Sequence, residues 1–179
     1  MLSQDNTALV VVDVQGKLAT LMYRQKNMHD GLVKMIKGAR MLELSVFWLE
    51  QLPEKLGPTS PSVADELKGL TPVAKASFSG CGEQAFMDSL KAAGKTHILL
   101  AGIEAHICVY QTALDLMNSG YEVEVVVDAT SSRSKQNKRL ALDKLARKGV
   151  EMTSVEMSLF ELMKTANCDA FRDVAKLVK

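Results

Sequence analysis

Ala8-Leu9-Val10-Val11-Val12-Asp13 is a run of five apolar residues closed by a carboxylate. The run does not alternate between apolar and polar positions, so a strand formed here would be buried on both faces. Strands of this kind are typical of parallel sheets that helices cover on either side. The run therefore predicts a strand of a parallel sheet, with Asp13 at its carboxyl end.

Similar runs alternate with helical segments along the rest of the chain. The predicted strands span residues 8–12, 45–49, 72–76, 97–103, 121–127 and 150–154. The predicted helices span residues 31–44, 83–93, 107–118, 135–148, 158–166 and 170–178. Residues 52–61, which hold three of the four prolines, are predicted as a surface loop. Strands and helices that alternate in this way favour an α/β fold with a parallel sheet and right-handed crossovers.

The size and charge of the chain limit the possible functions. It has 179 residues and a mass of 19.6 kDa, so we expect a single domain over residues 1–179. Lys and Arg total 22 and Asp and Glu total 21, which gives a formal net charge of +1. This balance excludes a generic basic nucleic-acid binder, and the basic cluster 133–139 is interpreted as the solvated start of a helix. No apolar run reaches about 18 residues, so we expect no membrane span.

Cysteine and histidine usage bears on the compartment and on cofactors. The three cysteines form no CxxC pair, and together with ten methionines they fit a reducing cytoplasm. The three histidines are not spaced as metal ligands, so we expect no metal. Neither a dinucleotide-binding glycine motif, nor a P-loop, nor a serine nucleophile elbow is present, so we expect no cofactor.

Ionisable side chains gather where the predicted strands end. Ligands of open parallel sheets bind outside the carboxyl ends of the strands. Asp13 closes the first strand, Lys75 lies near the end of the third, and Cys108 follows the fourth. An acid, an ammonium and a thiol would therefore share one edge of the sheet. Taken singly, Asp13 could equally be a structural acid that caps a turn, and Lys75 could equally face solvent.

Cys108 is the candidate nucleophile. It lies in the first turn of a predicted helix, where free N–H groups, the helix dipole and a nearby lysine would lower the pKa of the thiol. A small buried apolar residue is the competing interpretation. Cys81, in a Gly-Cys-Gly segment, is the rival nucleophile, and Cys168 is interpreted as structural. His106 is two residues from Cys108, so a Cys–His dyad on one helix face is not expected.

Three motifs together resemble the isochorismatase-like cysteine hydrolases. They are Leu9 to Gln15, Lys75 to Ser79 and Gly102 to Val109, in the order and at the spacings of that family. The resemblance covers roughly residues 7–154, and Glu50-Gln51 with Leu56 to Thr59 resembles the branch of small isochorismatase-domain proteins. It implies a three-layer α/β/α sandwich with a six-stranded parallel sheet in the order 3-2-1-4-5-6. It also implies an Asp13-Lys75-Cys108 triad and a non-proline cis peptide at Ile103–Glu104.

The resemblance further implies an activity. Cys108 is typical of the members that hydrolyse C–N bonds of small amide-type molecules through a thioester. Contacts with the substrate and the oxyanion are expected from Gln15, Gln51, Phe78, Ile103, Glu104 and Ala105. The histidines that hold a metal in the nicotinamidases are missing after the second strand, so a zinc site is not expected.

The family commonly forms dimers or larger assemblies, so we expect a homo-oligomer that acts on a small-molecule substrate. Residues 18–30, with Met22, Tyr23 and Met28, are a candidate contact segment. Two alternatives remain open on the same fold: a non-catalytic oligomeric interaction protein, and a thiol redox sensor that uses Cys108 or Cys81.

Overall fold

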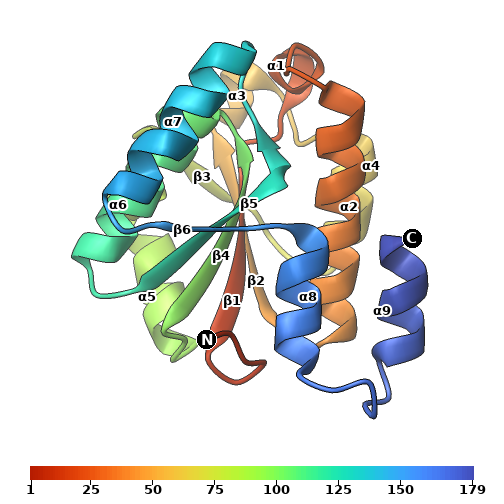
Figure 1. The fold of residues 1–179 in the computed structure, drawn as a ribbon. Coiled ribbons are helices and arrows are strands. Elements are labelled where there is room, and N and C mark those ends of the chain that lie inside the picture. Colours follow the sequence, from red (N-terminus) through yellow and green to blue (C-terminus); the bar gives the residue numbers. More distant parts are fainter.

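The computed structural model describes all 179 residues and contains one six-stranded sheet (Figure 1). The strand order is β3-β2-β1-β4-β5-β6, and every neighbouring pair is parallel. The strands are β1 (Thr7–Val12), β2 (Ser45–Gln51), β3 (Val73–Lys75), β4 (His97–Ile103), β5 (Glu122–Ser131) and β6 (Glu151–Thr153). The predicted α/β fold and strand order are confirmed.

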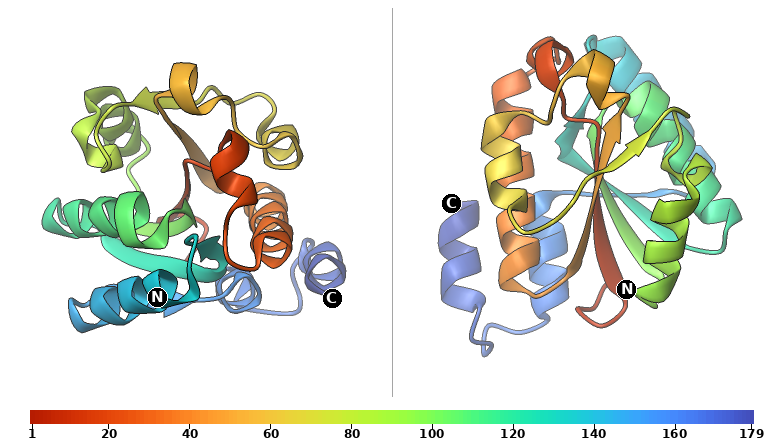
Figure 2. Two further views of the ribbon diagram at one scale, coloured as in Figure 1. Left: turned by 90° about the horizontal axis from the view of Figure 1, so that it is seen from above. Right: turned by 180° about the vertical axis from the view of Figure 1, so that it is seen from behind.

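Helices cover both faces of the sheet (Figures 1 and 2). One layer consists of α5 (Gln84–Ala92), α6 (Tyr110–Asn118) and α7 (Lys135–Arg147). The other consists of α2 (Gln25–Met41), α4 (Pro61–Ala64), α8 (Val155–Met163) and α9 (Phe171–Val178). The short helices α1 (Gly16–Thr20) and α3 (Pro53–Leu56) lie above the carboxyl ends of the strands. The molecule is therefore a three-layer α/β/α sandwich.

The central strand β1 divides the hydrophobic core between these layers. All its residues are buried. Leu9 and Val11 pack into the cluster under α2 and α8, whereas Val10 and Val12 pack into the cluster under α5 and α6. Each fully buried aliphatic side chain contributes about 1.5–3 kcal/mol, so an apolar run without polar positions suits this place.

Two segments differ from the sequence-based expectations. Helix α2 begins at Gln25, six residues before the predicted start, and it continues through Gly31. A Cβ at Gly31 would lie 2.6 Å from the carbonyl oxygen of Asp128, so this glycine permits close packing of helix on strand. Met22 and Met28 are buried in the core of the same subunit, so they are not exposed contact residues as predicted.

The helix that follows β4 also differs. It starts with a π-helical turn, η3 (Ala105–Val109), and continues as α6. Cys108 therefore lies in a π-helical turn that precedes α6, and not in the first turn of the α-helix itself. Residues 52–61, predicted as a loop, contain the short helix α3, which starts with Pro53.

Candidate active site

Asp13, Lys75 and Cys108 come from three separate places in the chain. Asp13 follows the last residue of β1, Lys75 ends β3, and Cys108 lies in η3 after β4. The exposed fractions of the three residues are 2%, 2% and 8%. An acid and an ammonium so thoroughly removed from water require partners, because unpaired buried charges are strongly unfavourable.

Lys75 reaches inward across β2 and does not point to solvent. Its Nζ donates to Asp13 Oδ2 at 2.7 Å and to Gln51 Oε1 at 2.6 Å. The carbonyl oxygens of Ser77 and Phe78 lie 3.3 and 3.1 Å from the same nitrogen. Gln51 pairs with Lys75 in the β2–β3 register, so it bridges the strand that separates Lys75 from Asp13. The ammonium is thereby held in one position beside the carboxylate.

The Asp13 carboxylate has one oxygen without a hydrogen bond, and a thiol is among its neighbours. Oδ1 is buried and accepts no hydrogen bond, while Cys108 is the neighbouring thiol that interacts with this carboxylate. Burial raises the pKa of Asp13, and the Lys75 ammonium and the Cys108 thiol act in the opposite direction. Asp13 Oδ1 is therefore the unoccupied acceptor of the site.

The surroundings of Cys108 favour the protonated form of its thiol. Burial, followed by the negative charge of Asp13, raises its pKa to about 12, and Lys75 only partly opposes this. The prediction of a thiol ionised by a helix terminus and a lysine is therefore wrong. The reason is physical: the Lys75 ammonium already contacts Asp13 and Gln51, and the buried carboxylate disfavours a second negative charge beside it.

Gln15 and Gln51 are engaged within the protein. Gln15 is fully buried; its Nε2 donates to the carbonyl oxygens of Gln51 and Gly57, and its Oε1 accepts from the Gln51 N–H. The Gln51 amide donates to the Ala76 carbonyl at 2.8 Å. Both side chains thus tie the ends of β1, β2 and β3 to the loop above them, and they support the position of Lys75.

The turn after β4 carries the other predicted residues. The peptide bond between Ile103 and Glu104 is cis. Ile103 and Ala105 are fully buried, and Glu104 is 5% exposed. Phe78 is 55% exposed, although its own backbone carbonyl accepts from Lys75 Nζ. Of the predicted contact residues, Phe78 is the one whose side chain lies largely in solvent.

Arg133 and His106 form contacts next to the site that the sequence did not indicate. Both the backbone N–H and the Nε of Arg133 donate to Glu104 Oε1 at 3.0 Å. His106 Nδ1 lies 2.9 Å from Ser132 Oγ, and its Nε2 lies 3.3 Å from Asn137 Nδ2. These contacts fasten η3 to the segment after β5. No local pattern marks them, because the partners are far apart in sequence.

Two further properties of the structure concern metals and membranes. No group of three or more His, Cys, Asp or Glu side chains is arranged to hold a metal ion. None of the helices combines the length and the apolar character needed to cross a bilayer.

Comparison with known proteins decides the family. The isochorismatase domain model matches residues 7–157. The chain belongs to the isochorismatase family. Isochorismatase domain-containing protein 2 of Danio rerio is 35% identical over 178 residues, which cover 99% of this chain and 89% of the relative. This family membership supports assignment to the hydrolases and leaves the bond that is cleaved open.

Solved structures share the fold of this isochorismatase-family chain. The MAR1 ribonuclease of Caenorhabditis elegans superimposes with a TM-score of 0.93 at 34% identity, over 99% of this chain and 91% of that one. The YcaC gene product of Escherichia coli, described as an octameric hydrolase of unknown specificity, gives a TM-score of 0.92. It is 21% identical and covers 98% of this chain and 88% of its own, so this likeness concerns the fold alone.

Proposed function

We propose that the protein is a cysteine hydrolase that cleaves a C–N bond of a small amide-type molecule through Asp13, Lys75 and Cys108. One observation carries this proposal: a buried carboxylate that interacts with a buried thiol of raised pKa has one acceptor oxygen free, while an ammonium holds its other oxygen at 2.7 Å. A thiol of this kind needs a base at the moment of attack, and Asp13 Oδ1 is the base in place.

The reaction begins when Cys108 Sγ attacks the carbonyl carbon and its proton passes to Asp13 Oδ1. The S–C bond forms, and the carbonyl electron pair moves to oxygen. Backbone N–H groups near Ala105 and Cys108 stabilise this oxyanion, and each such donor is typically worth about 3 kcal/mol. When the tetrahedral intermediate collapses, the C–N bond breaks and the proton on Asp13 moves to the leaving nitrogen.

A thioester on Cys108 remains and is cleaved by water. The oxygen of the water attacks the thioester carbon while Asp13 accepts a proton from that water. The same proton moves to sulfur when the C–S bond breaks. Lys75 keeps the developing negative charge compensated throughout, because its Nζ is fixed by Asp13 and Gln51. The three groups titrate as a coupled set.

The electrostatics favour an uncharged substrate. Burial is the main cause of the raised pKa values of Asp13 and Cys108, and the carboxylates of Glu50 and of Glu104, which is paired with Arg133, add to it in turn. The name of the C. elegans neighbour makes RNA the second candidate substrate. Carboxylates repel a phosphodiester, so a small neutral amide is the better match. Redox sensing is disfavoured because sensor thiols are exposed and have low pKa values.

Ammonia release from a panel of small amides, ureides and carbamates tests the proposal, with Cys108→Ser as the inactive control and a single-stranded RNA as a parallel arm. We expect turnover of at least one amide and a mass increase on the Cys108 peptide after rapid acid quench. Cleavage of RNA that survives Cys108→Ser, or the lack of both ammonia and adduct, would overturn it.

We also propose that the protein forms a homo-oligomer, supported by the octameric state of the E. coli neighbour. Light scattering coupled to size-exclusion chromatography measures this directly. A mass of 19.6 kDa at micromolar concentration would contradict the proposal.

A further inference from the structure

A cavity of about 670 Å³ lies at the edge of the sheet, apart from the candidate active site. Strand β6 pairs only with residues 124–126 of β5, so the rest of β5 has no strand on that side. The cavity occupies this place, between the start of α2, α7, the start of α8 and the end of α9. Asp13, Lys75 and Cys108 do not line it. We call it the edge cavity.

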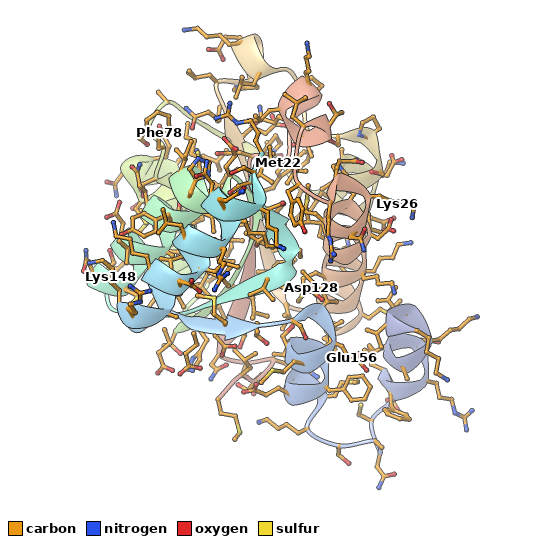
Figure 3. The ribbon with its side chains drawn as sticks, turned by 45° about the horizontal axis from the view of Figure 1, so that its top comes forward. Met22, Lys26, Phe78, Asp128, Lys148 and Glu156 are labelled. Carbon is orange, nitrogen blue, oxygen red and sulfur yellow. The ribbon has the colours of Figure 1, made fainter.

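Charged side chains line the edge cavity, and most of them make contacts within the chain. Lys138 Nζ donates to the Val127 carbonyl at 2.8 Å, and Lys34 Nζ donates to the Val178 carbonyl at 3.2 Å. Asp128 Oδ1 accepts from the Val155 N–H at 2.9 Å. Figure 3 shows Asp128 near the end of β5 and Glu156 at the start of α8, on the same side of the molecule.

Arg24, which is exposed, is the one of the three cations lining the edge cavity whose charged group contacts no oxygen of the chain. Its guanidinium lies over the Tyr23 ring, 5.6 Å from the centroid, and it forms neither an ion pair nor a side-chain hydrogen bond. Burial lowers the pKa of Lys138, the carboxylate of Asp128 opposes this, and the positive charge of Arg24 makes a smaller contribution in the same direction as burial. Both cations border the edge cavity.

We propose that the edge cavity binds a small oxyanion, a carboxylate or a phosphate group, held between Arg24 and Lys138. Its volume lies within the range of small-molecule sites, about 300–1,000 Å³. A guanidinium offers a bidentate pair of donors to such a group, and an ammonium with one N–H on Val127 has two more to give. An anion placed here would be attracted by both cations and repelled by Asp128 and Glu156, which also border the cavity.

Glu156 sets the sign of a decisive test. It is exposed, forms no ion pair, and borders the same cavity, so it repels the anion. Glu156→Gln is therefore expected to tighten binding, whereas Arg24→Gln and Lys138→Gln should each weaken it about tenfold. Arg147→Gln is the matched control, since Arg147 is an exposed arginine on α7 outside the cavity.

The experiment titrates the full chain with sodium phosphate and, separately, with sodium succinate, against sodium chloride of equal ionic strength. Amide chemical shifts follow binding in the wild type and in Cys108→Ser. We expect saturable shifts confined to the starts of α2, α7 and α8, equal in both proteins. A response to phosphate alone would assign phosphate esters, and one to succinate alone would assign carboxylates. Unsaturable shifts, or equal affinities in Arg24→Gln, Glu156→Gln and Arg147→Gln, would overturn the proposal.

Discussion

Asp13→Asn should increase the reactivity of the Cys108 thiol toward alkylation and decrease the rate of amide hydrolysis. Asparagine keeps the shape of the side chain but removes its negative charge and its basic oxygen. Because the charge of Asp13 helps to raise the pKa of the thiol, its removal should make Cys108 easier to ionise. Because Asp13 is the proposed base, amide hydrolysis should fall to the level of Cys108→Ser.

The size of the first effect follows from the thiol pKa. With a pKa of about 12, roughly one Cys108 in ten thousand is ionised at pH 8, against about one in ten for a thiol at the ordinary value of 9.0. A close charge shifts a pKa by about 1–3 units, and Asp13→Asn also leaves the Lys75 ammonium facing the sulfur. We therefore expect alkylation of Cys108 by iodoacetamide at pH 8 to become at least about tenfold faster, since only the thiolate reacts.

Mass spectrometry of the Cys108 peptide gives the alkylation rate separately from those of Cys81 and Cys168. Asp88→Asn, an exposed aspartate on α5, is the control and should leave the rate unchanged. A folded Asp13→Asn protein that is alkylated no faster than the wild type would refute the role given to the Asp13 charge.

Three further predictions concern stability. Glu124 lies opposite Glu151 in the β5–β6 pairing, and burial with the charges of Glu161 and Glu151 raises its pKa from 4.5 to about 7. Because the pKa of this carboxyl is higher in the folded protein than in the unfolded chain, its ionisation destabilises the fold, and the free energy of unfolding should fall as pH rises from about 4.5 through 7. Urea denaturation of Glu124→Gln should show a smaller change of this free energy over the same pH range. Gly102→Ala should cost at least about 3 kcal/mol, because its φ is +123° and a Cβ would collide with the Val12 backbone; thermal unfolding measures this. Lys75→Met should cost about 3–5 kcal/mol in denaturant titrations and raise the pKa of Asp13, since it leaves a buried carboxylate unpaired.

The fold was accessible from sequence because its main signal is local. Five consecutive apolar residues in β1 favour burial on both sides, and a parallel sheet between two helical layers provides it. The same reasoning placed Asp13 and Lys75 at strand ends. The start of α2 was missed because Gly31 looks like a helix boundary, whereas its role is a close approach to Asp128 that only the packed structure reveals.

The protonation state of the site was not accessible in this way. A helix terminus and a lysine both lower a thiol pKa, and both are visible in the sequence. Burial of Cys108 and the orientation of the Asp13 carboxylate depend on the meeting of three strands, and they outweigh the local effects. The internal hydrogen bonds of Gln15 have the same origin, since they join residues 36 and 42 positions apart.

The uncovered part of β5 has a consequence for the behaviour of the protein at high concentration. Lys138 occupies the Val127 carbonyl, Gly31 packs against that of Asp128, and the Tyr23 N–H binds that of Ser132. An incoming strand would find the Val127 and Ser132 carbonyls already hydrogen-bonded and the Asp128 carbonyl covered by α2, and Lys138 adds charge repulsion and a desolvation cost. Strand addition at this edge of β5, and fibril growth from it, is therefore disfavoured.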